Sequence, residues 1–155
     1  MNGLVRALHV AAIVLWIGGV AMVTLVLLPA VRALDRRDAF TLFERLERRF
    51  AAQARWTTAL AGASGLYLTY ALDLWWRFAE ARYWWMWAMV AVWLLFTLML
   101  FVLEPLVMHR WFAARARSDP AATLQLIQRM HYGLLLASLV TVIGATAGAH
   151  GFLLF

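Results

Sequence analysis

The chain contains no cysteine and no lysine, and only three of its 155 residues are proline. Without cysteine it cannot form disulfides, thiolate zinc sites or cysteine-ligated iron–sulfur clusters. Charged residues are also scarce, at 14% of the chain, whereas 65% of the residues are apolar. A soluble domain of this length would be about half apolar. The composition therefore excludes an ordinary soluble globular domain and indicates an integral membrane protein.

The apolar residues fall into four long runs, at roughly residues 3–31, 53–76, 83–109 and 129–154. Each run exceeds the ~20 residues that a helix needs to cross a bilayer. We therefore expect an all-α protein, a four-helix transmembrane bundle that forms a single domain over residues 1–155. The first run is too long for the apolar part of a signal peptide, so we interpret it as the first membrane helix.

The connections carry their own signals. Residues 38–52 combine charge with apolar residues at helical spacing, which predicts a short interfacial helix on the cytoplasmic side that runs into the second span, with a solvated helical linker as the alternative. Ser118-Asp119-Pro120 predicts the start of the last helix, with proline at its first position. The small-residue patterns Ala61-x-x-x-Gly65 and Gly144-x-x-x-Gly148 predict close helix packing.

All 14 basic residues are arginine, and they are unevenly distributed. The first and third connections hold most of them: Arg32, Arg36, Arg37, Arg45, Arg48, Arg49, Arg110, Arg115 and Arg117. The opposite side has only Arg6, Arg77 and Arg82. By the positive-inside rule this bias predicts a multi-pass protein of a bacterial inner membrane with both termini outside. The net charge of +6 then fits anionic lipid headgroups, with no nucleic-acid partner.

Four histidines lie close to the water-facing ends of the predicted spans, where a polar side chain is costly unless it has a partner, a metal or a proton to move. His9 and His150 fall near the outer face, and His109 and His131 near the inner face. His131 and His150 are separated by about 28 Å of helix, so they cannot share one metal ion. This pattern predicts one site near each face, or one site with the other pair structural.

Neutral imidazole suits haem iron, copper and zinc alike. A four-helix bundle can offer axial ligands to a haem from facing helices. Arg6 lies one turn from His9 and is placed for haem propionates outside, while Arg110 and Arg129 are placed for them inside. Each histidine also has a purely structural interpretation as an interfacial polar side chain.

Glu104-Pro105 lies inside the third predicted span, where an acidic side chain is costly to bury in lipid. We therefore expect Glu104 to face the bundle interior or a wet cavity. We expect Glu104 to relay a proton or to pair with Arg55 or Arg129. Pro105 should kink the helix and free a backbone carbonyl nearby.

The first run also resembles a known opening helix. Leu8-His9 followed by Leu15-Trp16-Ile17-Gly18-Gly19 is similar to the first helix shared by the membrane domain of copper resistance protein D and the HemJ-type protoporphyrinogen oxidases. Further along, Arg49-Phe50 with Gly65-Leu66-Tyr67, and then Gln128-Arg129-Met130-His131, also look like patterns of the copper-resistance family. The resemblance implies a four-helix membrane protein in which His9 is associated with haem b. The oxidases have a lysine near the start of the third helix, which this lysine-free chain lacks.

Together these features predict a haem b membrane protein with one or two haems, ligated by histidines as a bis-histidine cytochrome. It would pass single electrons between a quinone or periplasmic donor and a partner protein. One alternative is copper transport or copper resistance, with histidine and methionine as transient ligands. Another is a structural subunit of a larger membrane complex. The glycine-rich helix faces also predict pairing with a second copy or a larger subunit.

Overall fold

The computed structural model describes residues 1–33 and 36–152, except for the side chains of residues 36–41, 44 and 109. These residues form helices joined by short turns, with no strand in the described ranges. The predicted all-α class is therefore confirmed.

Four long helical stretches make up the chain. The first stretch consists of α1 (Asn2–Met22), the π-helical η1 (Val23–Leu27) and α2 (Leu28–Arg32), and the second is the single helix α3 (Arg36–Ala71). The third follows the 3-10 turns η2 (Trp75–Ala79) and η3 (Ala81–Tyr83) and consists of α4 (Trp84–Leu98), the π-helical η4 (Met99–Met108) and α5 (His109–Ser118). The fourth is α6 (Pro120–Ala149).

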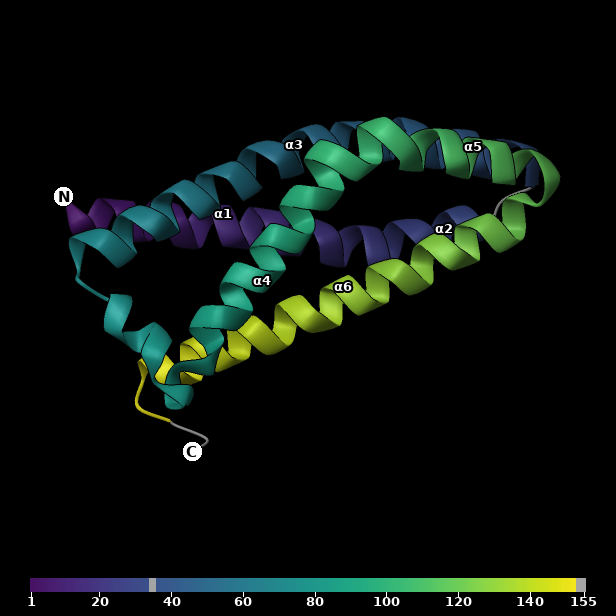
Figure 1. Ribbon diagram of the computed structural model, residues 1–155. Coiled ribbons are helices and arrows are strands. Elements are labelled where there is room, and N and C mark those ends of the chain that lie inside the picture. Colours follow the sequence, from purple (N-terminus) through teal and green to yellow (C-terminus); the bar gives the residue numbers. More distant parts are fainter. Residues whose placement is uncertain (34–35, 153–155) are drawn as a thin grey trace.

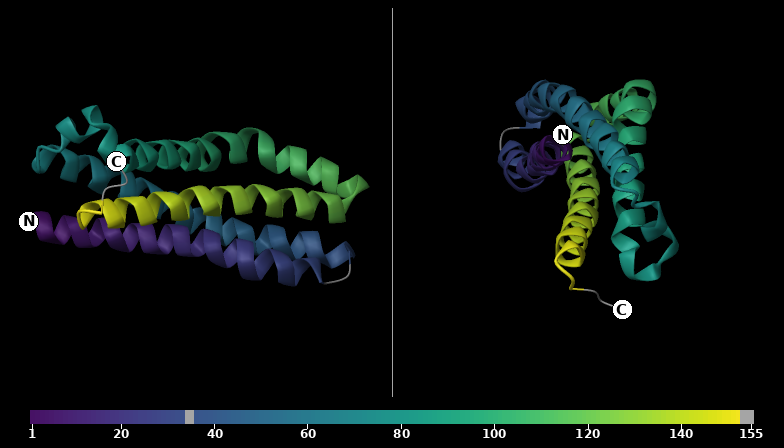
Figure 2. Two further views of the ribbon diagram at one scale, coloured as in Figure 1. Left: turned by 90° about the horizontal axis from the view of Figure 1, so that it is seen from below. Right: turned by 90° about the vertical axis from the view of Figure 1, so that its left-hand side faces the viewer.

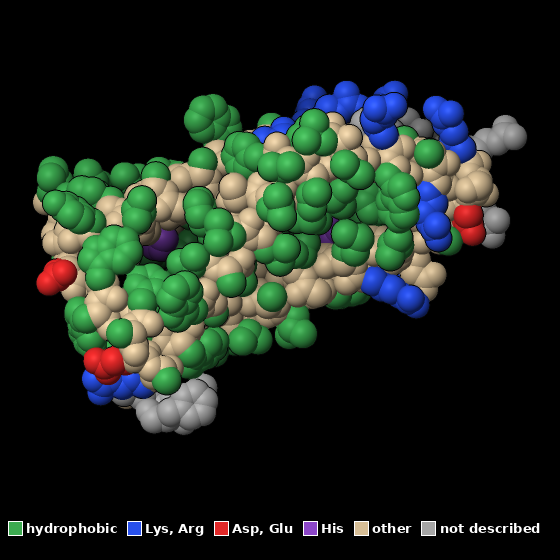
Figure 3. All heavy atoms as spheres, viewed as in Figure 1, with side chains coloured by type: hydrophobic (Ala, Val, Ile, Leu, Met, Phe, Trp, Pro, Cys, Tyr) green, Lys and Arg blue, Asp and Glu red, His purple; other side chains and the backbone are tan. Residues whose placement is uncertain are grey.

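The four stretches run back and forth along one long axis (Figures 1 and 2). The N-terminus, the connection 72–83 and the end of α6 lie at one end of the molecule, which we call the cavity end (Figure 1). The end of α2, the start of α3 and the α5–α6 junction lie at the other, which we call the arginine-rich end. Basic side chains gather towards that end in the space-filling view (Figure 3).

The interfacial helix 38–52 runs into the second predicted span, and together they form one continuous helix, α3. Several helix ends differ from the predicted ranges: α3 ends at Ala71, the third stretch continues to Ser118 and α6 ends at Ala149. No glycine or proline interrupts residues 36–61, so nothing in the local sequence breaks the helix there. The start of the last helix is as predicted: Pro120 is its first residue and the Asp119 carboxylate accepts a hydrogen bond from the Ala122 amide, at 2.9 Å.

Among the described residues, three helical stretches are long and apolar enough to cross a membrane: Asn2–Arg32, Ala81–Met108 and Pro120–Ala149. Helix α3 has small or polar residues at inward positions, as at Thr57, Thr58 and Ser64, which are all buried. Its exposed large side chains from residue 56 onward are apolar or aromatic: Trp56, Leu60, Leu66 and Tyr70.

Glycines let the helices approach closely, as the small-residue patterns predict. A Cβ on Gly148 would lie 2.2 Å from the indole of Trp85, and one on Gly144 would lie 2.5 Å from that of Trp84. These contacts join α6 to the start of α4. Between α1 and α3, a Cβ on Gly65 would lie 3.0 Å from the imidazole of His9. The close packing brings α3 against the first candidate site residue.

Candidate functional site

The three histidines with described side chains share one hydrogen-bonding arrangement. The Nδ1 atoms of His9, His131 and His150 lie 3.0, 2.9 and 2.8 Å from backbone carbonyl oxygens. A carbonyl oxygen can only accept, so in the neutral imidazole Nδ1 carries the proton and Nε2 keeps its lone pair. No hydrogen bond joins these Nε2 atoms to another described residue. A protonated Nδ1 bonded to the backbone is the usual arrangement of a histidine that ligates a metal through Nε2.

His9 is the most firmly oriented of the three. Its Nδ1 donates to the carbonyl of Ala61 at 3.0 Å and contacts the hydroxyl of Ser64 at 2.9 Å. Both partners lie on α3, so the imidazole is fixed from a neighbouring helix. His131 and His150 are held only from within α6, by the carbonyls of Ile127 and Thr146 one turn earlier.

The described contacts do not bring two histidines into one site. His9 lies on α1 against α3, His131 is half-buried towards the arginine-rich end, and His150 is exposed at the end of α6. The side chain of His109 lies outside the described residues. Within the part of the chain whose side chains are described, no three His, Asp or Glu side chains gather as a metal-ion site would require.

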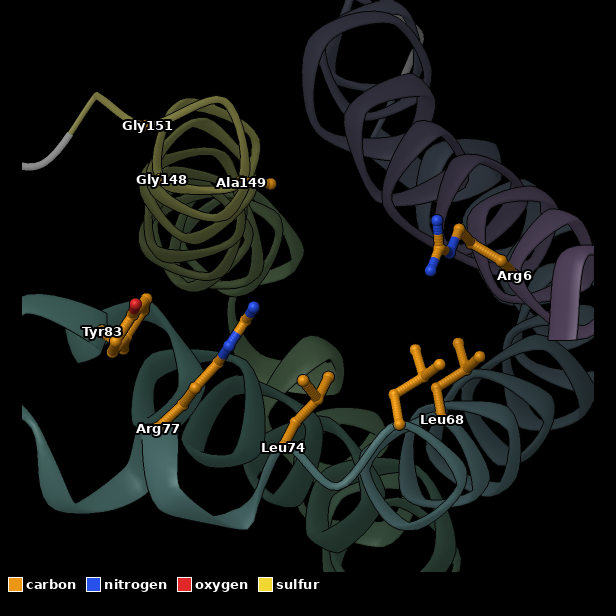
Figure 4. Close-up of a pocket in the computed structure, with 9 residues that line it drawn as sticks. Arg6, Leu68, Leu74, Arg77, Tyr83, Gly148, Ala149 and Gly151 are labelled. Atoms are coloured by element: carbon orange, nitrogen blue, oxygen red, sulfur yellow. The ribbon is translucent and has the colours of Figure 1, made fainter.

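A cavity of about 560 Å³ opens at the cavity end, between α1, α3, the connection 72–83 and the end of α6 (Figure 4). It has an apolar wall from α3 and a small-residue wall from α6, and two arginines and a tyrosine complete it. The lining residues are Arg6, Leu68, Leu72, Leu74, Arg77, Tyr83, Gly148, Ala149 and Gly151.

The two arginines reach into this cavity from opposite sides. Figure 4 shows Arg6 extending from α1 and Arg77 extending from the connection towards the end of α6. The guanidinium of Arg77 stacks on the rings of Trp76 and Tyr83, at 5.5 and 5.2 Å from their centroids. Its Nε is buried and has no partner among the described residues. The cavity thus offers two cations to an anionic ligand with an apolar body.

His9 lies one helical turn from this cavity. Arg6 precedes His9 by three residues on α1, and Leu68 follows Gly65, which faces the imidazole of His9, by three residues on α3. Residues three apart on a helix lie on the same face. Arg6 and His9 therefore lie on one face of α1, and His150 directly follows Ala149, a lining residue of the opposite wall.

Glu104 forms an ion pair with Arg55 towards the arginine-rich end, with 2.9 Å between Arg55 Nη2 and Glu104 Oε1. This is one of the two partners that the sequence suggested for the acid. Arg55 and Glu104 expose 35% and 24% of their side chains. Arg129 is exposed, and the neighbouring Gln128 is buried and accepts a hydrogen bond from Arg32.

Pro105 lies inside the π-helical η4 and frees a carbonyl, as the sequence predicts. In a π-helix the N–H of residue i donates to the carbonyl of residue i−5, so proline at 105 leaves the Leu100 carbonyl without that donor. Arg55 Nε donates to the Leu100 carbonyl at 3.1 Å. One arginine of α3 therefore satisfies both the acid and the carbonyl that the proline releases.

Two residues of the site escape the sequence analysis. Arg77 belongs to the run Trp75-Trp76-Arg77, which is typical of an aromatic belt at a membrane surface. Its position at the cavity depends on the path of the connection 72–83, which the sequence does not reveal. Ser64 is one of several small residues on α3, and only the register of α3 against α1 identifies it as the partner of His9. The sequence signal that could have identified Ser64 is its place as a polar residue within the close-packing pattern Ala61-x-x-x-Gly65.

The chain belongs to a family described as a domain of unknown function (DUF4149), which matches residues 11–116. Neither the curated proteins nor the solved structures yield a match. The matched stretch contains Arg55 and Glu104, whereas His9, His131 and His150 lie outside it. The match therefore shows which family the chain belongs to, but it does not cover these three histidines and gives no role for them.

Proposed function

We propose that this protein is a multi-pass protein of a bacterial inner membrane that binds haem b at the cavity end and transfers single electrons. The observation that carries the proposal is the cavity with Arg6 and Arg77 on two sides and the oriented imidazole of His9 one turn away. A planar apolar ligand with two carboxylates matches a cavity that has an apolar wall and two cations.

The membrane part of the proposal includes α3 as a fourth span. Three stretches already meet the length and hydropathy that crossing requires. The large side chains that α3 exposes from residue 56 onward are apolar or aromatic, and the polar ones face inward. That arrangement suits a helix with lipid outside and protein inside, because a polar group exposed to lipid has no partner. With the arginine-rich end in the cytoplasm, both termini and the cavity face out.

The chain's own residues have separate tasks in this proposal. His9 supplies a lone pair on Nε2, while the Ala61 carbonyl and Ser64 hydroxyl on its other nitrogen fix the ring and its tautomer. Arg6 and Arg77 hold the carboxylates. Ala149 and Gly151 leave the opposite wall without bulky side chains. His150 directly follows the lining residue Ala149 and would be the second histidine to hold the group, since His131 lies about 28 Å from it along α6.

When bound, haem b supplies reversible one-electron redox chemistry at its iron. The protein contributes binding, orientation and partial exclusion of water, and the open cavity leaves a route for a quinone or a redox protein to approach. The residues present fit the group, in that the cavity carries two cations and an apolar wall, and His9 lies one turn from the lining residue Arg6 on α1.

An optical spectrum of the detergent-purified protein, oxidised and then reduced with dithionite, tests the proposal. Expression must be accompanied by an adequate haem supply. A Soret band with sharp reduced α and β bands is the expected result. A featureless spectrum under these conditions would overturn haem binding and would direct attention to metal analysis for copper.

A further inference from the structure

Four buried polar atoms without a described partner belong to α1, α3 and the α4–η4 stretch. They are Trp16 Nε1, Thr58 Oγ1, Thr97 Oγ1 and Glu104 Oε2. A buried polar atom that lacks a hydrogen bond costs free energy, so native proteins satisfy nearly all of them with protein or water partners. In a membrane protein the cost is greater still, because lipid supplies none. These atoms therefore need an explanation.

Thr58 is an exception among the buried hydroxyls. The others, at Thr24, Thr57, Ser64, Thr123, Ser138 and Thr141, donate to a carbonyl three or four residues earlier. Thr58 is fully buried, has the same helical setting and makes no such bond to any described residue. Its hydroxyl is thus available to a molecule that comes from outside the helix.

Thr58 and Thr97 lie between two hydrogen bonds that cross from one helix to the next. On the side towards the cavity end, Trp93 Nε1 donates to the Thr58 carbonyl at 3.0 Å, and Thr97 is one turn further along the face that carries Trp93. On the other side, Arg55 bonds the Leu100 carbonyl. Arg55 precedes Thr58 by three residues, and Leu100 follows Thr97 by three. The two hydroxyls therefore lie in the same short stretch of the α3–α4 interface.

Glu104 lies just beyond this stretch, with Oε1 bonded to Arg55 and Oε2 buried without a described partner. Its side chain is 24% exposed and that of Arg55 is 35% exposed, so the pair reaches the surface, and both residues lie beyond Thr58 and Thr97 in the direction of the arginine-rich end. On the opposite side the indole of Trp93 packs closely against α3, since a Cβ on Gly62 would lie 2.4 Å from it. The stretch therefore lies between the Trp93 indole and the Glu104 carboxylate.

We propose that bound water bridges Thr58, Thr97 and Glu104 in an inlet that is reached from the arginine-rich end. Water is both donor and acceptor, so it can satisfy two hydroxyls and a carboxylate oxygen together. Arg55 remains charged and holds the carboxylate in place. The inference does not depend on haem binding.

The stability of Thr58→Val and Thr97→Val variants tests the water site, with Thr141→Val as the matched control because its hydroxyl is satisfied by the Ala137 carbonyl. If water bonds the hydroxyls, both variants should melt at a lower temperature than the control, since valine leaves the water and the carboxylate unpaired. If the hydroxyls lie in a dry interface, removing them relieves a penalty. A melting temperature equal to or above that of the control would overturn the proposal.

Cysteine labelling provides a second measurement that does not depend on stability, and the cysteine-free chain allows it without background. Thr97→Cys should react with a small cationic methanethiosulfonate added to vesicles whose arginine-rich end faces the reagent. Ser138→Cys is the control, because Ser138 is fully buried and bonded to the Leu134 carbonyl. Faster reaction at residue 97 supports an inlet, and equal rates at the two positions would contradict it.

Discussion

Arg55 Nη2 lies 2.9 Å from Glu104 Oε1, and the same guanidinium also bonds the Leu100 carbonyl, which Pro105 leaves without its helical donor. A break in one helix is thereby compensated by a single side chain from another. The arrangement explains how an acid and a proline are tolerated inside a long apolar helix, three to four residues before the apolar stretch ends at Met108. It also ties α3 to η4 at the level where the proposed water inlet begins.

The Arg55–Glu104 pair should show energetic coupling. We expect Arg55→Ala and Glu104→Ala each to destabilise the protein by about 1–3 kcal/mol, because each leaves a partly buried charge unpaired. The double variant should lose less than the sum, since neither charge then remains. Thermal melting in detergent of the four proteins checks this, and additive effects would contradict a direct pairing.

Gly148 should not tolerate a side chain. Gly148→Ala places a methyl group within 2.2–2.4 Å of three atoms of Trp85, which is only 4% exposed and cannot move away. Overpacking of this kind costs about 1–3 kcal/mol. Gly133→Ala, on the same helix with nothing within 4 Å, should be neutral or slightly stabilising. Similar melting temperatures for the two variants would argue against the described α4–α6 contact.

The orientation in the membrane can be read with single cysteines. Ala79 and Ala114 are both exposed, one in the connection at the cavity end and the other on α5. With the arginine-rich end in the cytoplasm, an impermeant maleimide should label Ala79→Cys in right-side-out vesicles and Ala114→Cys in inverted ones. The reverse pattern would place the cavity in the cytoplasm and refute the proposed topology.

Ser64 should act through His9 rather than on a ligand directly. Ser64→Ala removes one of the two contacts at His9 Nδ1 and leaves the Ala61 carbonyl. Loss of such a supporting bond typically weakens ligand binding about tenfold. Haem titration of the purified apoprotein should show this loss with the α and β bands still present. Ser138→Ala is the control, and an affinity equal to that of the control would exclude the orienting role.

Much of the fold can be read from the sequence, for physical reasons that particular residues illustrate. Pro120 after Asp119 determines where α6 begins, because proline suits the first helical position and aspartate caps it. The apolar runs predict the long helices because their lengths match those that a helix needs to cross a bilayer. By contrast, the end of α3 at Ala71 is not predicted, because the apolar run continues to Trp76 while the backbone turns at Asp73, whose φ is 48°.

The candidate site is predicted less completely, because it depends on register between helices. From the sequence alone, His9 stands out as a polar side chain inside an apolar run, and Arg6 stands out because it lies one turn from His9. The sequence also predicts Glu104 as a buried acid and gives Arg55 as one of its two possible partners. Arg77 and Ser64 become visible only when the connection 72–83 and the register of α3 against α1 are known. The roles of the histidines as ligands stay predictions.

Haem binding through His9 can be tested by the haem content of three proteins purified side by side. Pyridine haemochrome analysis would be made on the unaltered protein, on His9→Ala and on His131→Ala. We expect about one haem per chain in the unaltered protein and in His131→Ala, and a spectrum without a Soret band in His9→Ala. Equal haem in His9→Ala and in the unaltered protein would exclude His9 as the ligand, and no haem in any of the three would overturn haem binding.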